Sequence, residues 1–222
     1  LMQSLAEIEE PLALFTEGIA GKYFHIRTSE EFASHRRLAL GEAGTGQTSD
    51  TIFLPETLDS PNAASYRVLV LEQIGLRECG TFGFRMSRAL EHMPGLSVRY
   101  REPRGLTART GDFQRLFGVF AQPGLAADIF NLAEKARILG YLRRAYPGIR
   151  RHVTQYHGYL LSLSGPSNDA LIAGKRQIWG EFSGLWPDFC HSLVTVAEQT
   201  GSVYDSVAVL LQNYDEIEGA YV

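Results

Sequence analysis

Histidine, cysteine and carboxylate side chains are the residues of this chain that could bind a metal ion or activate water. The histidines are His25, His35, His92, His152, His157 and His191. None has a partner histidine four residues away with an acidic neighbour, the spacing that places two zinc ligands on one helix face. His152 and His157 are five residues apart, on different faces of a helix. A zinc-dependent hydrolase that uses distant histidines stays open as an alternative.

The stretch Leu71–Phe82, LEQIGLRECGTF, has the rhythm of a metalloprotease helix. In such helices two histidines four residues apart bind zinc, and a glutamate beside the first activates water. Here the two positions hold Glu72 and Leu76, and Gln73 stands beside the first. Leucine has no lone pair, so even with Glu134 as a further ligand the set falls short of a tetrahedral site. We therefore expect a buried helix without a metal.

Other catalytic patterns are missing from the sequence. No GxSxG elbow occurs, and Cys190 and His191 are adjacent, whereas a catalytic pair approaches from separate elements. The loop GEAGTGQT has Gln47 where a phosphate loop needs lysine. Glu134 with Arg137, and Glu72 with Arg77, are plausible ion pairs. We expect no catalytic residue, no cofactor and no ATP site.

Composition favours a folded protein of the cytoplasm. Apolar residues make up 45% of the 222 residues, enough for a substantial core. No segment approaches the ~18 apolar residues of a membrane span, and the N-terminus does not have the pattern of a signal peptide. The two cysteines are too few for a disulfide scaffold and are expected to be free thiols.

Charge is distributed unevenly along the chain. The net charge is −4, but residues 66–151 carry 15 basic and 7 acidic side chains, while the segments on either side are acidic. Most of the basic residues are arginine. They are not interleaved with stacking aromatics in a nucleic-acid reader motif, so we expect no nucleic-acid partner. The basic middle either pairs with the acidic ends or faces an acidic protein.

Apolar periodicity predicts a mainly α fold with two or three short strands. We expect residues 1–222 to form a single helical domain, a fragment of a longer protein, with an Arg-rich loop at about 94–111. Ser4 with Glu7 predicts a capped first helix, kinked or divided at Pro11. Further expected elements are a strand at 51–56, helices from Ser29, from about residue 62 to Gly80, from Asp112 and, after Pro123–Gly124, from Leu125 to Tyr146, and helices in the remainder of the chain.

Two stretches carry a resemblance to a known family: IFLPETLDS with NAASYRVLVLEQIGLRECGTFGF, and FQRLFGVFAQPGLAADIFNLAEKARILGYLRRAYPGIR. They resemble the N-terminal region of the von Willebrand A-domain proteins called CbbO and NorD, over roughly residues 50–151. The positions that fit the family pattern are Tyr66, Gln73, Gly75, Glu78, Gly80, Thr81, Phe82, Arg137, Tyr146, Gly148 and Arg150. The two histidines of the pattern are Glu72 and Leu76 here, and its first acid on the second helix is Glu134. The resemblance thus implies a degenerate metalloprotease-like scaffold, whose Gly75, Gly80 and Phe82 are expected to be packing residues.

The resemblance also implies a partner. CbbO and NorD proteins work with a hexameric MoxR-class AAA+ ATPase to remodel inhibited Rubisco or nitric oxide reductase, respectively. We expect a non-enzymatic adaptor domain of a CbbO-like Rubisco activase, with a NorD-like protein as the alternative; a helical domain that only braces the A-domain is a third possibility. Rubisco would be engaged by an A-domain that these residues do not include. The candidate residues for binding the ATPase are the arginines Arg99, Arg101, Arg104, Arg143, Arg144, Arg150 and Arg151.

Overall fold

The computed structural model describes residues 2–32, 46–59, 64–100, 111–153, 187–199 and 201–221. It is mainly helical with a few short strands, as expected from the periodicity. The chain divides into two compact units. The first unit takes its described residues from 1–78 and 142–168, and the second from 79–141 and 169–222. Within the described residues, no helix is both long and apolar enough to cross a membrane.

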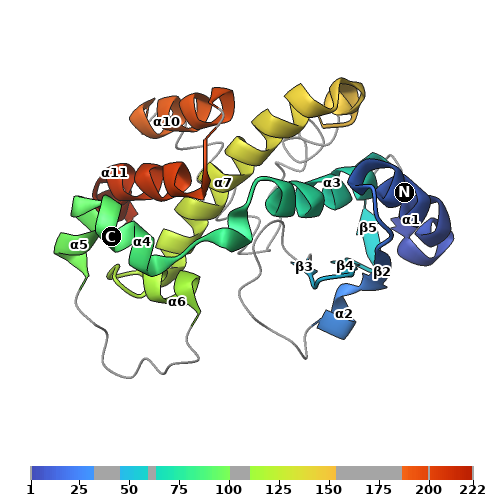
Figure 1. The fold of residues 1–222 in the computed structure, drawn as a ribbon, viewed down its shortest axis with the longest axis horizontal. Coiled ribbons are helices and arrows are strands. Elements are labelled where there is room, and N and C mark those ends of the chain that lie inside the picture. The colour runs from blue at the N-terminus through green and yellow to red at the C-terminus, as the bar shows by residue number, and fades with distance from the viewer. Residues whose placement is uncertain are drawn as a thin grey trace. The chain divides into compact units, whose positions relative to one another are not determined.

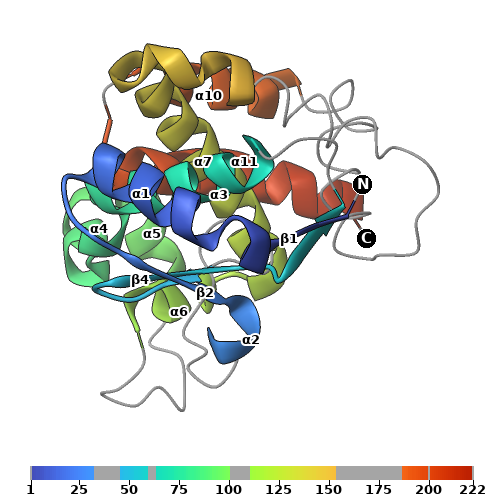
Figure 2. The same cartoon turned by 90° about the vertical axis from the view of Figure 1, so that its right-hand side faces the viewer.

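The first unit combines helices with two small sheets. Its elements are β1 (Met2–Ser4), η1 (Leu5–Glu7), α1 (Glu9–Ala20), β2 (His25–Thr28), α2 (Ser29–Phe32), β3 (Gly46–Gln47), β4 (Thr51–Leu54), β5 (Thr57–Asp59), α3 (Ala64–Glu78) and η4 (Pro147–Ile149). Strand β1 pairs antiparallel with β5, and the second sheet has the order β2-β4-β3, with β2 parallel to β4. Figure 2 shows α1 and α3 on one side of β2 and β4, with α2 on the other.

The core of the first unit lies between α3 and the strands. Ile26, Ile52 and Leu54 alternate toward the helices from β2 and β4, and each is almost fully buried. Helix α3 packs against β4 and α1, and nearly all its described side chains from Ser65 to Leu76 are buried. A helix that is apolar on most of its circumference is buried on most sides, which explains why α3 lacks a solvent face over this stretch.

The described residues of the second unit form helices and no strand. The helices are η3 (Thr81–Gly83), α4 (Met86–His92), α5 (Pro94–Arg99), α6 (Asp112–Phe117), α7 (Pro123–Ala145), α10 (Pro187–Glu198) and α11 (Val203–Tyr221), with the last residues of α7 assigned to the first unit. Figure 1 shows α10 beside α11, and α4 beside α6. An aromatic cluster joins the α6 region to α7, where Phe113 stacks on Phe84 at 4.8 Å and meets Phe130 at 5.2 Å between ring centroids.

Several predicted boundaries are confirmed. Strand β4 ends before Pro55, and helix α7 begins at Pro123, two residues before the predicted start at Leu125. Gly80 adopts a left-handed conformation with φ of 69°, which ends α3 as expected of a glycine at that place. Helix α11 begins at Val203, where the Asp205 carboxylate accepts a hydrogen bond from the Ser202 N–H at 2.6 Å.

Other predicted boundaries are wrong. The Ser4 side chain caps no helix: residues 2–4 pair with β5 as β1, and α1 begins only at Glu9, with Pro11 in its first turn. Pro11 is tolerated there because the first N–H groups of a helix have no intrahelical acceptor. Part of the expected loop at 94–111 is α5, which buries Leu96. Asp112 is the first residue of α6 rather than its cap. Residues 33–45, 101–110 and 154–186, where further elements were expected, lie outside the described residues.

Candidate functional site

The positions of the metal motif on α3 are part of the core. Glu72 and Leu76 are both 3% exposed, and Gln73 beside them is 1% exposed. Leu76 offers only apolar contacts at a position where a zinc helix would need a nitrogen or oxygen ligand. These two positions belong to the first unit, whereas Glu134, the third position of the motif, belongs to the second unit.

Glu134 is the centre of a buried cluster of polar side chains. Its Oε1 accepts hydrogen bonds from the Thr81 hydroxyl and from Arg137 Nη2 at 2.6 Å. Its Oε2 accepts from Arg137 Nε at 2.8 Å and from the Ser206 hydroxyl at 2.7 Å. A carboxylate has about four lone-pair sites, so these four bonds use its full capacity. We call Thr81, Glu134, Arg137 and Ser206 the Glu134 cluster.

Arg137 extends this cluster to two main-chain carbonyls. Its Nη2 donates to the Cys79 carbonyl and its Nη1 to the Gly201 carbonyl, each at 3.1 Å. Burial alone would lower the pKa of Arg137, but its hydrogen bond and charge contact with Glu134 outweigh burial and raise that pKa. The cluster therefore fastens η3, α7 and the start of α11 together. The predicted Glu134–Arg137 ion pair is confirmed, whereas its hydroxyl partners were not foreseen.

This arrangement does not suit Glu134 as a metal ligand. Each of its oxygens already accepts from two donors, and a metal ion would have to displace an arginine fork that is 3% exposed. Within the described ranges, no three histidine, cysteine or acidic side chains are grouped closely enough to hold a metal ion. His35 and His157 lie outside those ranges, so the alternative of dispersed histidines stays a prediction about them.

The other predicted ion pair, between Glu72 and Arg77, does not form. Arg77 instead donates through Nη1 to the Ser49 carbonyl at 3.2 Å and through Nε and Nη2 to Gln47 Oε1. Lys22 Nζ donates to the same Ser49 carbonyl at 2.8 Å. Gln47, which stands in place of the lysine of a phosphate loop, thus fastens the turn before β4 to α3, and its own amide donates to the Gln73 carbonyl at 2.7 Å.

A second contact joins the two stretches that carry the family resemblance. The Tyr146 hydroxyl lies 3.1 Å from both carboxylate oxygens of Glu78 and donates to this carboxylate. Both residues belong to the first unit. In the second unit, Thr81 from the first stretch contacts Glu134 and Arg137 from the second. Residues of the pattern that are about 50 to 70 positions apart in sequence are therefore direct neighbours in the fold.

The candidate arginines divide into two groups. Arg99 makes an ion pair with Asp215, and its guanidinium lies over the Phe120 ring at 5.7 Å, so it is used inside the second unit. The others that the structure describes are all exposed and belong to the first unit: Arg143, Arg144, Arg150 and Arg151. Arg101 and Arg104 lie outside the described residues. No acidic residue occurs between positions 135 and 168, so the exposed group has no acidic neighbour in sequence.

Phe82 differs from the expectation. It was expected to be a packing residue, but its side chain is 46% exposed, while Thr81 before it is fully buried. Phe82 lies in the 3-10 turn that follows Gly80, so the apolar period of α3 does not determine the direction of its side chain.

Comparison of the chain with protein-family models, curated proteins and solved structures finds no match.

Proposed function

We propose that this chain is a non-enzymatic adaptor domain of a CbbO-type protein that docks onto a hexameric MoxR-class AAA+ ATPase. The observation that carries this proposal is the pairing of the two stretches that resemble that family. Thr81 with Glu134 and Arg137, and Glu78 with Tyr146, join residues of the pattern that are distant in sequence. These contacts explain why the residues of the pattern occur together: each polar side chain forms hydrogen bonds with another residue of the pattern.

The chemistry of Glu134 supports a binding role over hydrolysis at the motif positions. A catalytic carboxylate needs an oxygen free to bind metal, water or a substrate proton. In the Glu134 cluster these oxygens accept from Arg137, Thr81 and Ser206. We infer that the motif keeps the shape of a metalloprotease-like scaffold and serves as the frame for a docking surface. In a CbbO-type assembly the remodelled target would be inhibited Rubisco, and in a NorD-type assembly nitric oxide reductase.

Size-exclusion chromatography of the chain with purified MoxR-class hexamers is the direct test. We expect co-elution with a CbbO-partner hexamer, and loss of Rubisco reactivation when the domain is deleted from the full-length activase. A parallel experiment uses the hexamer that works with a NorD-type protein. Stronger binding of the chain to this hexamer than to the CbbO-partner hexamer would favour nitric oxide reductase as the target. Absence of binding to either ring, or stoichiometric zinc in the purified protein that is lost on His152→Ala or His157→Ala, would overturn the proposal.

A further inference from the structure

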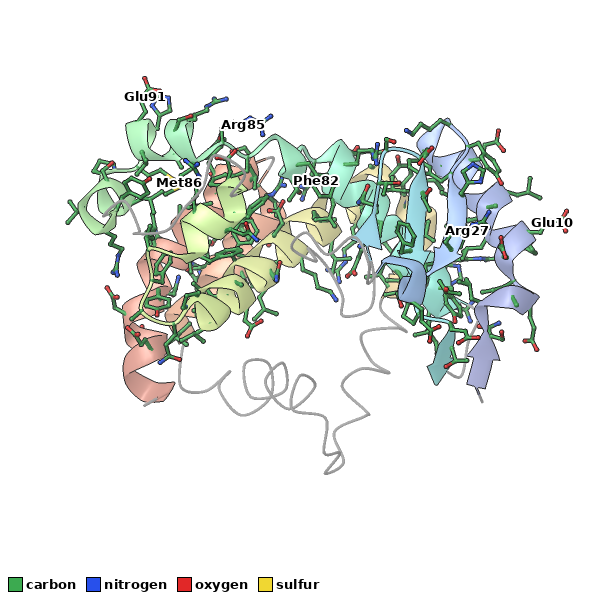
Figure 3. All side chains as sticks on the ribbon, turned by 90° about the horizontal axis from the view of Figure 1, so that it is seen from below. Glu10, Arg27, Phe82, Arg85, Met86 and Glu91 are labelled. Atoms are coloured by element: carbon green, nitrogen blue, oxygen red, sulfur yellow. The ribbon has the colours of Figure 1, made fainter. Side chains whose placement is uncertain are left out.

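An exposed aromatic side chain stands at the turn between α3 and α4. Phe82 is 46% exposed, although Thr81 and Phe84 on either side of it are almost fully buried. Figure 3 labels Phe82, Arg85 and Met86 along this segment. Leaving a phenylalanine ring half in water forgoes stabilisation of roughly 1 kcal/mol or more relative to burying it. An exposed large apolar side chain among polar ones is a common feature of protein-binding surfaces.

The turn that carries Phe82 is held rigidly. Gly80 reverses the chain with φ of 69°, and the Thr81 hydroxyl is fixed by the Glu134 cluster. Two residues after Phe82, the Phe84 ring stacks on Phe113 at 4.8 Å. Both neighbours of the exposed ring are therefore anchored in the core of the second unit. A side chain that is held in place before binding loses less conformational entropy when a partner covers it, which increases affinity.

Two exposed arginines, Arg85 and Arg88, follow Phe82 along the chain, and both contact Tyr204 of α11. The main-chain N–H of Arg85 donates to the Tyr204 hydroxyl at 3.2 Å, and the Arg88 guanidinium lies over the Tyr204 ring at 5.2 Å. Arg85 Nη1 also donates to the Phe84 carbonyl at 3.0 Å. Since Phe82 and Arg85 are three residues apart, their Cα atoms are at most about 11 Å apart, within the reach of one short peptide. We call Phe82, Arg85, Arg88 and Tyr204 the anchor surface.

The charges near the anchor surface leave its arginines available. Arg85 reaches Asp112 only at 3.9 Å, the outer limit of an ion pair, and the Arg85 side chain stays 64% exposed. Arg88 forms no ion pair within the part of the chain that the structure describes. Glu91, the nearest acidic residue along α4, lies 3.8 Å from His92 Nε2 instead. Cation–π stacking on Tyr204 orients the Arg88 guanidinium while its N–H groups stay free for a carboxylate.

We propose that the anchor surface binds an acidic segment of a partner protein, with an apolar side chain of that segment against Phe82 and its carboxylates on Arg85 and Arg88. The charge of the two arginines selects the carboxylates, and the half-exposed ring selects the apolar neighbour. This inference rests on the proposed function for the identity of the partner, which would be the ATPase ring. The surface itself is defined by contacts within the second unit alone.

Fluorescence anisotropy with a labelled peptide tests the surface separately from the ATPase. The probe is a 12-residue peptide that alternates glutamate and leucine, and the control peptides replace glutamate by lysine or leucine by serine. We expect the full chain to bind the glutamate–leucine peptide in preference to both controls. Phe82→Ala and the double variant R85E/R88E should each weaken binding by about tenfold or more, as expected for anchor residues of an interface. The variant R27E/R67E has the same charge change at two exposed arginines of the first unit and should bind like the wild type.

The outcomes separate the inference from the proposed function. Equal binding of the peptide by wild type, Phe82→Ala and R85E/R88E would overturn the inference, as would loss only in R27E/R67E or preference for a single-stranded DNA of similar length. If the peptide binds at the anchor surface but the hexamer does not co-elute with the chain, the proposed function fails and the surface stands. Urea unfolding of each variant checks folding, and Phe82→Leu, which keeps an apolar side chain, should retain most of the binding.

Discussion

The two units are stabilised by different kinds of polar contact. In the first unit, side chains donate to the neutral carbonyls of loops: the Tyr66 hydroxyl reaches the Pro55 carbonyl at 2.9 Å, and Arg77 and Lys22 hold the Ser49 carbonyl. The described contacts of the Glu134 cluster in the second unit instead join charged and hydroxyl side chains from three elements.

The difference determines how each unit should respond to substitution. A neutral carbonyl that loses one donor costs about 1 kcal/mol, because other donors or water can replace it. A buried charge that loses its counter-charge costs about 3–5 kcal/mol, because nothing nearby neutralises it. We therefore expect the second unit to contain the single residues on which stability depends most strongly.

The largest effect is expected for Glu134→Leu. This substitution leaves the Arg137 guanidinium, 3% exposed, without its carboxylate and should lower the free energy of unfolding by about 3–5 kcal/mol. Urea denaturation followed by circular dichroism measures the change.

The control is the double variant E134L/R137M, in which both charges are removed. It should recover much of the loss, since replacement of a whole buried ion pair by apolar residues is often neutral. A double variant that is less stable than the single one would contradict the assignment of the cost to an unpaired charge, and would point to the hydroxyl and carbonyl partners instead.

Close packing of helices in the second unit provides the next prediction. A Cβ atom added at Gly140 of α7 would overlap the main chain of Ala197 in α10. Because the obstacle is backbone, Gly140→Ala should destabilise the protein by about 1–3 kcal/mol or displace α10. Gly124→Ala on the same helix, where a Cβ meets nothing within 4 Å, is the matched control and should be neutral or slightly stabilising. Thermal unfolding of both variants compares them, and equal melting temperatures would argue against close packing of α7 on α10.

In the first unit, Tyr66→Phe removes the hydroxyl that donates to the Pro55, Glu56 and Gln3 carbonyls. We expect a loss of about 1 kcal/mol in the free energy of unfolding, because the ring and its packing remain. A loss as large as that of Glu134→Leu would remove the contrast between the units. Urea denaturation at neutral pH is the measurement.

The same tyrosine predicts a pH dependence. Burial, together with the nearby Glu56 charge, raises the pKa of Tyr66 from 10.0 to about 12. Only the protonated hydroxyl is stabilised in the folded state, so its contribution is complete below pH 10 and is lost as the pH rises from 10 toward 12. The unfolding free energy of the wild type should fall over this range more steeply than that of Tyr66→Phe. Parallel pH profiles would show that Tyr66 ionises as readily in the folded protein as in the unfolded chain.

The smallest effect is expected for the Arg27–Glu9 pair of the first unit. Its atoms are 3.1 Å apart, but both side chains are nearly half exposed. Glu9→Gln should change stability by about 0–1 kcal/mol, with less effect at high salt. A change larger than that of Tyr66→Phe would mean that surface charge stabilises this unit more than its loop contacts do.

Local sequence signals predicted the elements that depend on local chemistry. The period of α7 and the left-handed Gly80 follow from side-chain spacing and backbone sterics, which act within a few residues. The Glu134–Arg137 pair was predictable for the same reason, since residues three apart are neighbours on a helix.

Contacts between distant parts of the chain were not predictable. Thr81 and Ser206 reach Glu134 from 53 and 72 residues away, and no local spacing indicates them. Ser4 has the sequence of a cap, but pairing with Thr57 in a sheet overrides that preference. The exposure of Phe82 depends on the 3-10 turn after Gly80. The helical period of the preceding residues does not predict this turn.

Each of the two units is built from two separate segments of the chain, which limits how the protein can be truncated. Described residues of the first unit come from both sides of the segment 79–141, and those of the second unit from both sides of the segment 142–168. No single cut of the gene therefore releases one complete unit. During synthesis the Glu134 cluster also has to wait for Ser206, so 72 further residues must be added after Glu134 before this carboxylate acquires its last partner.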